Sequence, residues 1–261
     1  MTTIIINADD FGLNEGRTRA ILEFMREGVV SNTTLMTNMP FADQAVRMAK
    51  TAGVDASVGL HLNLTQGRPL TAEMARTSFF CTAGGEFNEQ FHNRTLTRLR
   101  VPRSVRAVLR AELRAQIERY LEFGLTERHL DSHHHAHTDF SVMRELLPLL
   151  REYEFKSVRL SANFPWSAYG LAKKIYKLAF NSWIPRTLKK THYFCQPGAA
   201  DEHWGELDGA CVELMTHPMR CRDGAGDDSD VRGEYETKFD SLRALLDRHS
   251  GDYRLVSYAE L

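Results

Sequence analysis

Cysteine is scarce in this sequence, and its positions follow no metal-binding or disulfide pattern. Cys81, Cys195, Cys211 and Cys221 show neither CxxC spacing nor a dense framework. Small secreted domains that depend on disulfides carry cysteines much more densely. We therefore expect reduced thiols in a cytoplasmic protein, and no structural zinc site built from thiolates.

The sequence also lacks a long hydrophobic run and an excess of charge of either sign. Its longest apolar stretches are far too short for a membrane span, and residues 1–6 lack the basic region that begins a signal peptide. Lys and Arg number 33 and Asp and Glu number 34, for a formal net charge of −1. That balance gives no overall electrostatic reason to expect nucleic acid or an anionic membrane as a partner.

What the sequence does have is a concentration of histidine, since residues 128–137 (RHLDSHHHAH) contain five histidines and an aspartate. In an extended strand, alternation would place Asp131, His133, His135 and His137 on one side and His134 on the other. All five histidines therefore cannot bind one ion. A solvated histidine tract is the alternative, but apolar, amphipathic segments flank this one, which favours a buried metal site.

A pair of carboxylates, Asp9 and Asp10, directly follows the apolar, β-branched run at residues 2–8. One aspartate there could simply cap the helix expected over residues 14–27. Two buried carboxylates are costly unless they bind something, so the pair favours a functional site.

Three more polar residues fall within or at the ends of predicted strands. His61 shares one face of the strand over residues 55–64 with Asn63, Arg159 lies in the strand over residues 155–160, and His217 follows the apolar run that ends at Thr216. A lone histidine in a strand is usually a hydrogen-bonded core residue. Together with the aspartate pair and the histidine tract, His61 is better explained as a ligand.

Strands and helices alternate along the whole chain, which predicts an α/β fold with a parallel sheet in a single domain over residues 1–261. We expect strands at 2–8, 29–37, 55–64, 155–160, 191–196, 211–216 and 253–258, and a further strand that runs into a loop within the histidine-rich stretch 128–137. We expect helices at 14–27, 41–51, 101–123, 139–153, 165–183 and 234–248. Long loops are expected at 66–90 and 220–232. Seven or eight such strands would form a distorted (β/α) barrel, in which the carboxyl ends of the strands meet at the active-site face.

A carboxylate and two imidazoles would suit Zn²⁺, Fe²⁺, Mn²⁺ or, with more water, Mg²⁺. Such an ion lowers the pKa of water toward neutrality, a second carboxylate can take the proton, and a histidine can protonate the leaving group. This set of groups serves hydrolysis of an amide, an ester or a phosphoester. The residues alone therefore indicate a metal-dependent hydrolase.

Four motifs narrow this prediction by resemblance. Residues 7–12 (NADDFG), 59–65 (GLHLNLT), 129–137 (HLDSHHHAH) and 216–218 (THP) resemble those of the YdjC/ChbG-like carbohydrate deacetylases, which are similar to NodB-type polysaccharide deacetylases. The motifs span nearly the whole chain in the same order. The resemblance implies a distorted barrel and hydrolytic removal of acetyl from an N-acetylated sugar, such as an N-acetylglucosamine-containing oligosaccharide or glycoconjugate.

The resemblance also implies roles for individual residues. Asp10, His61 and His133 would hold one divalent metal ion, Mg²⁺ or Zn²⁺, with Mn²⁺ or Co²⁺ as further candidates. Asp9 would be the general base and His217 the acid for the amine leaving group.

The remaining polar residues would support that site. Arg159 would orient Asp9 or contact substrate, and four residues near the ligands would orient them or contact substrate: His129, Asp131, His135 and His137. The expected partner is a small carbohydrate, with no nucleic acid and no membrane span, and a homodimer is expected from the base rate for enzymes of this size.

Two other functions use the same residues. A metal-dependent phosphoesterase would favour two ions, with His135 or His137 as further ligands. A non-catalytic carbohydrate-binding or metal-binding protein would need no general base, so the intact pair of Asp9 and Asp10 argues against it.

Overall fold

The computed structural model describes residues 1–88, 90–93, 95–218 and 242–261. One parallel sheet runs through it in the order β5-β4-β3-β2-β1-β7-β6, and β8 pairs with the first residues of β1. The strands are β1 (Thr2–Phe11), β2 (Asn32–Leu35), β3 (Val58–Leu62), β4 (His129–Ser132), β5 (Ser157–Val158), β6 (Tyr193–Cys195), β7 (Cys211–Thr216) and β8 (Tyr253–Leu255). The expected α/β fold with a parallel sheet is confirmed.

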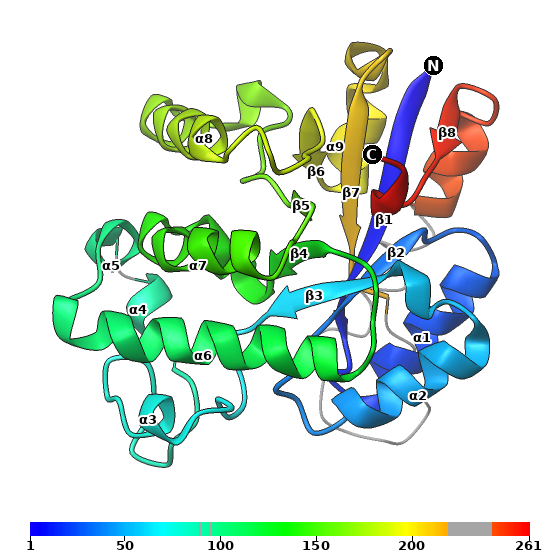
Figure 1. Cartoon of the computed structure of the whole chain (residues 1–261). Coiled ribbons are helices and arrows are strands. Elements are labelled where there is room, and N and C mark those ends of the chain that lie inside the picture. The colour runs from blue at the N-terminus through cyan, green and yellow to red at the C-terminus, as the bar shows by residue number, and fades with distance from the viewer. Residues whose placement is uncertain (89, 94, 219–241) are drawn as a thin grey trace.

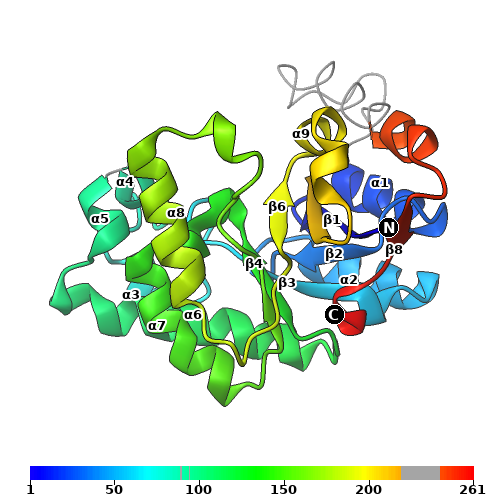
Figure 2. The same ribbon diagram turned by 90° about the horizontal axis from the view of Figure 1, so that it is seen from above.

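Helices cover the outside of the curled sheet (Figures 1 and 2). They are α1 (Glu15–Arg26), α2 (Ala42–Ala52), α3 (Ala72–Ala75), α4 (Gln90–Asn93), α5 (Thr95–Leu99), α6 (Arg103–Glu122), α7 (Phe140–Glu152), α8 (Leu171–Trp183) and α9 (Pro197–Glu202). A single parallel bridge between Ser157 and Lys189 links β5 to the segment before β6. The sheet is thus a distorted, incompletely closed (β/α) barrel, as expected. Within the described residues, no helix is both long enough and apolar enough to span a membrane.

The central strand β1 explains why the carboxylates lie where they do. Its residues Ile4, Ile6 and Ala8 are fully buried, because parallel strands are covered on both faces. The strand continues to Phe11, so it carries Asp9 and Asp10 at its carboxyl end rather than stopping before them. Both carboxylates therefore lie at the open end of the barrel, directly after the apolar part of the strand.

One expectation about β4 is wrong. The strand ends at Ser132, and residues 133–138 form 3-10 turns in which His134 and His135 have φ values of 51° and 56°. Left-handed backbone breaks the two-residue alternation of a strand, so His133, His135 and His137 do not share one side.

Most other element boundaries differ from the expected ones by a few residues. The strand over Cys211–Thr216 agrees at both ends, whereas the helix expected at 165–183 is divided into a 3-10 turn, Trp166–Ala168, and α8. The expected long loop at 66–90 contains the short α3. The loop expected at 220–232 and the first part of the helix expected at 234–248 lie outside the described residues, and residues 242–248 are helical.

The last residues of the chain close the amino-terminal end of the barrel. Tyr258 packs with Ile5 and Val256, and its ring stacks on His129 with 3.3 Å between ring centroids. Its backbone N–H donates to Asn32 Oδ1 at 3.2 Å. The opposite end of the barrel, where the predicted site residues gather, is left accessible.

Candidate active site

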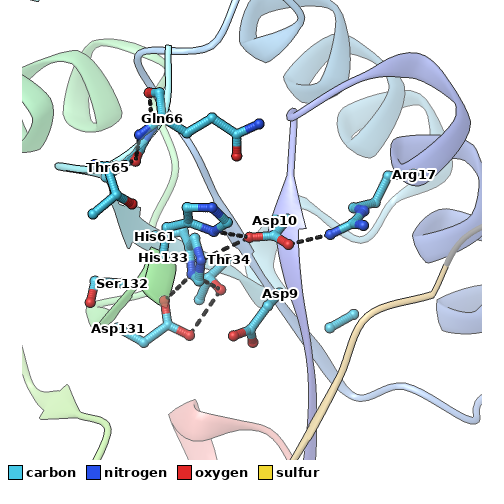
Figure 3. A network of polar contacts seen from close by, with 12 residues as sticks. Asp9, Asp10, Arg17, Thr34, His61, Thr65, Gln66, Asp131, Ser132 and His133 are labelled. Atoms are coloured by element: carbon cyan, nitrogen blue, oxygen red, sulfur yellow. Dashed lines mark hydrogen bonds and ion pairs between the residues drawn. The ribbon is translucent and has the colours of Figure 1, made fainter. Parts of the chain in front are cut away.

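Most of the predicted site residues meet at the carboxyl ends of the strands, around a pocket of about 390 Å³. β1 supplies Asp9 and Asp10, β3 supplies His61, the turn after β4 supplies His133, and His217 follows β7. Figure 3 shows Asp10 between the two imidazoles on one side and Arg17 on the other, with Asp9 nearby. The pocket is also lined by Leu13, Arg17, Gln66, His134 and His135.

Asp10, His61 and His133 form a compact group of metal-ligand atoms. Asp10 Oδ1 lies 2.8 Å from His133 Nδ1 and 3.1 Å from His61 Nε2. Ligands of a tetrahedral zinc ion lie about 3.3 Å from one another when each is about 2.0–2.1 Å from the metal. His61 Nε2 is buried and makes no hydrogen bond in the described structure. These residues therefore fit a divalent ion.

The other face of His61 fixes the orientation of its ring. His61 Nδ1 lies 2.6 Å from Asp131 Oδ1 and 3.1 Å from Thr34 Oγ1, so Nδ1–H donates to the carboxylate and the Nε2 lone pair faces the pocket. Burial alone would lower the pKa of His61, but the attraction of Asp131, the hydrogen bond of Nδ1 to Asp131 and the 3.1 Å contact of Nε2 with Asp10 raise it to about 10. An ion at Nε2 would take the place of that extra proton.

Asp10 is held in a conformation that aspartate adopts uncommonly. Its φ is 68°, and its carbonyl accepts the N–H of Leu13 at 3.1 Å in a tight turn. Oδ2 accepts a hydrogen bond from Arg17 Nη1, which leaves Oδ1 directed toward the histidines. Burial raises the pKa of Asp10, but the hydrogen bond to His133 and the close contact with His61 hold it well below its usual range.

Asp9 is bound by a different set of donors. Arg159 Nη1 donates to Oδ2 and Nη2 to Oδ1, both at 2.6 Å, and Asn7 Nδ2 donates to Oδ1 at 2.8 Å. Burial raises the pKa of Asp9, but the adjacent guanidinium outweighs it and holds the carboxyl below its usual range. In the described structure Oδ2 accepts one hydrogen bond against two for Oδ1, so Oδ2 has the freer lone pair.

Arg159 is fully buried and binds three carboxylates. Besides Asp9, it lies 2.8 Å from Asp131 Oδ2 and donates Nε–H to Glu213 Oε1 at 2.5 Å, while its guanidinium stacks on Phe194. Burial raises the pKa of Glu213 to about 7, although Arg159 favours its charged form. Because Asp131 also holds His61, Arg159 links Asp9 at the pocket to the buried carboxylate that orients His61.

His217 lies at the pocket as a half-buried residue just beyond β7. Burial lowers the pKa of its imidazole, although Asp9 and Asp10 favour its charged form. An imidazole there can take up a proton and pass it to a bound molecule.

The remaining histidines of the tract are dispersed. His129 is buried near the amino-terminal end of the barrel, with Nδ1 2.9 Å from Ser157 Oγ, and His137 is buried between Ser132 Oγ and the carbonyl of Arg159. Neither of these two residues lines the pocket, whereas His135 does, with its pKa lowered by burial to about 3.

Sequence reasoning missed several residues that complete the site. Arg17, Gln66 and Thr34 contact the pocket or its ligands, and Glu213 holds Arg159. Glu213 could have been identified from the sequence, since it is a charged residue in the middle of the apolar strand over residues 211–216. Arg17 lies on an ordinary amphipathic helix, and nothing in its sequence context indicates a role in the site.

Comparisons with known proteins show the family to which the chain belongs. A family model described as YdjC-like protein matches residues 3–249. A carbohydrate deacetylase of Brevibacillus brevis is 31% identical to this chain over 267 residues, which cover 99% of each chain. A carbohydrate deacetylase of Geobacillus stearothermophilus is 41% identical over 149 residues, which cover 57% of this chain and 56% of that protein.

A solved structure shares the fold. It is that of an Enterococcus faecalis V583 protein named for cellobiose-phosphate cleavage, with a TM-score of 0.74, 20% identity, and coverage of 99% of this chain and 98% of that one. At that identity the likeness concerns the fold alone.

Proposed function

The chain belongs to the YdjC-like family, and we propose that it is a cytoplasmic carbohydrate deacetylase that uses one divalent metal ion to remove acetyl from an N-acetylated sugar. The main support for the proposal is that the adjacent residues Asp9 and Asp10 have different binding partners at the same pocket. Asp10 faces two imidazoles, one with an unpaired buried nitrogen, whereas Asp9 is bound by a guanidinium and faces the same pocket.

Asp10, His61 and His133 would hold the ion. When bound, it supplies Lewis acidity, which acidifies water and polarises the acetamide carbonyl. Mg²⁺ and Zn²⁺ are the first candidates, with Mn²⁺ and Co²⁺ next. Two imidazoles and one carboxylate are the donor set of several catalytic zinc sites, and three protein ligands leave a coordination position open.

Asp9 acts as the general base. Its carboxylate is ionised at neutral pH because Arg159 stabilises the charge, and Oδ2 has room to accept a proton from the attacking water. Arg159 and Asn7 fix the plane of the carboxylate, so the accepting lone pair is oriented before substrate arrives.

His217 acts on the leaving group. It lies at the pocket with Asp9 and Asp10, whose charges favour the imidazolium form, and that form can deliver the proton that the departing amine needs. His134, His135 and Gln66 line the same pocket and would contact the sugar. Asp131 and Thr34 orient His61 and do not touch substrate in this scheme.

The test is acetate release from N-acetylglucosamine and its oligomers, with p-nitrophenyl phosphate as the parallel substrate. We expect Asp9→Asn to lose about 10³-fold or more in kcat while it keeps its bound metal. Asp43→Asn, which removes a surface carboxylate paired with Arg119, is the matched control and should behave as the parent. Equal activity of Asp9→Asn and parent would refute the role of Asp9, and phosphate release without acetate release would favour a phosphoesterase.

A further inference from the structure

Helix α8 turns apolar side chains toward solvent. Among the described residues, four of the eight exposed large hydrophobic side chains lie on it: Leu171 is 75% exposed, Ile175 59%, Leu178 52% and Trp183 39%. The first three are spaced four and three residues apart, which places them on one face of the helix. A stripe of this kind on a protein surface usually marks a binding face.

The opposite face of α8 attaches the helix firmly to the rest of the protein. Phe180 is fully buried, Phe140 of α7 packs against both Phe180 and Trp183, and Asn181 exchanges hydrogen bonds of 2.9 and 3.0 Å with the backbone of Ser161. Figures 1 and 2 show α8 beside α7 at the edge of the molecule. The stripe is therefore presented by a well-packed helix and not by a loose one.

Positive charge accompanies the stripe. Residues 160–200 contain six Lys and Arg and no Asp or Glu, although the whole chain is balanced at 33 against 34. Lys173 is exposed on α8, and Lys174 and Lys177 are partly exposed. Arg186 and Lys189 are exposed just beyond the helix. Although the formal net charge of the whole chain is −1, lysines and arginines are therefore concentrated around the apolar face of α8.

The neighbouring helix α5 contacts α8 and also carries exposed apolar side chains. Arg98 of α5 lies over the ring of Tyr176 of α8, with 5.7 Å between guanidinium carbon and ring centroid. Two leucines of α5, Leu96 and Leu99, are exposed as well.

We propose that α8 docks this protein on an anionic lipid surface. A helix with Leu and Ile on one face, Lys on its flanks and Trp at its end has the composition of helices that lie in a membrane interface. Anionic headgroups would neutralise the lysines while the stripe enters the acyl boundary. A second copy of this face would bring lysines against lysines, which is repulsive.

The test measures binding of the full chain to vesicles of phosphatidylcholine alone and of phosphatidylcholine with phosphatidylglycerol, by flotation at low and high salt. We expect binding to the anionic vesicles only, reduced by salt. Ile175→Glu combined with Leu178→Glu, and separately Lys173→Glu combined with Lys174→Glu, should each weaken it by about tenfold or more. The matched controls are Leu70→Glu, which changes a leucine 40% exposed elsewhere, and Arg26→Glu on α1, and both should bind as the parent does.

Three results would overturn the proposal. The first is that the parent binds anionic and neutral vesicles equally, and the second is that both double variants bind vesicles as well as the parent does. The third is that the parent is a dimer and Ile175→Glu/Leu178→Glu is a monomer, which would mean that a second copy of the chain covers this face. Thermal unfolding of each variant separates loss of docking from loss of fold. Because acetate release from soluble sugars is measured apart from vesicles, failure here leaves the proposed deacetylase activity standing.

Discussion

Arg159 holds Asp9 through two parallel hydrogen bonds of 2.6 Å, from Nη1 to Oδ2 and from Nη2 to Oδ1. This fork fixes both the plane and the charge of the carboxylate proposed as general base. The guanidinium comes from just beyond β5 and the carboxylate from β1, so the pair exists only when the barrel is assembled.

Replacing Arg159 by Lys should separate positioning from charge. A lysine keeps one positive charge but cannot bind both carboxylate oxygens in a plane, so kcat should fall by about 10²-fold. The pKa of Asp9 should rise, because burial is less well opposed, and the acid limb of kcat/KM should move to higher pH. Arg110→Lys is the control, since Arg110 also donates twice to a carboxylate, that of Glu145, away from the pocket. An unchanged pH profile in Arg159→Lys would mean that Arg159 does not tune Asp9.

Replacing Asp131 by Asn should weaken metal binding without removing a ligand. Asp131 accepts Nδ1–H of His61 at 2.6 Å, and loss of its charge makes the imidazole a poorer ligand. We expect the metal Kd to rise by about 10–100-fold in a chelator competition assay. Asp201→Asn, which removes a carboxylate bound to Arg248 at the surface, should leave the Kd unchanged. If both variants bind metal equally well, His61 is not a ligand oriented by Asp131.

Glu213 should make folding stability depend on pH. Its pKa is raised from 4.5 to about 7 in the folded protein, mainly by burial, so the folded state binds the proton more tightly than the unfolded state. The resulting stabilisation is complete below about pH 4.5 and is lost as the pH rises through about 7.

Urea unfolding of the parent and of Glu213→Gln at a series of pH values checks this. The parent should lose about 1–3 kcal/mol more than Glu213→Gln between about pH 5 and pH 8. Parallel pH profiles would show that Glu213 is ionised throughout, in which case the carboxylate is a permanent partner of Arg159.

Gly12 should be intolerant of a side chain because it ends the turn that holds Asp10. Its φ is 85°, and a Cβ there would lie 2.9 Å from Leu35 Cδ1 and 3.3 Å from Ala42 Cα. Gly28 has a similar φ of 72° but open space around it. We expect Gly12→Ala to cost about 2–4 kcal/mol of unfolding free energy and Gly28→Ala about 1 kcal/mol. Equal costs would mean that backbone conformation alone decides the effect.

The sequence predicted the parallel α/β fold well because its signals were local. The apolar run before Asp9, the alternation around His61 and the strand before His217 each identified a strand and its polar end. Once the strands are parallel, their carboxyl ends must lie at one edge, so these residues were expected to meet.

Other features could not be predicted because they depend on long-range contacts or on unusual backbone. Nothing local indicates that His134 and His135 adopt positive φ, which moves His137 away from the pocket. The contacts of Arg159 with Asp131 and Glu213 join three separate strands or strand ends. Net charge also concealed the cations of α8, because charge counts carry no spatial information.

The most direct test of the whole account is a stoichiometric titration of metal-stripped protein with Zn²⁺ or Mg²⁺, followed by acetate release from an N-acetylglucosamine oligomer. The site formed by Asp10, His61 and His133 predicts no activity without metal and full activity at one ion per chain. His133→Ala should neither bind the ion tightly nor release acetate. Acetate release by the stripped protein, or a requirement for two ions per chain, would contradict it.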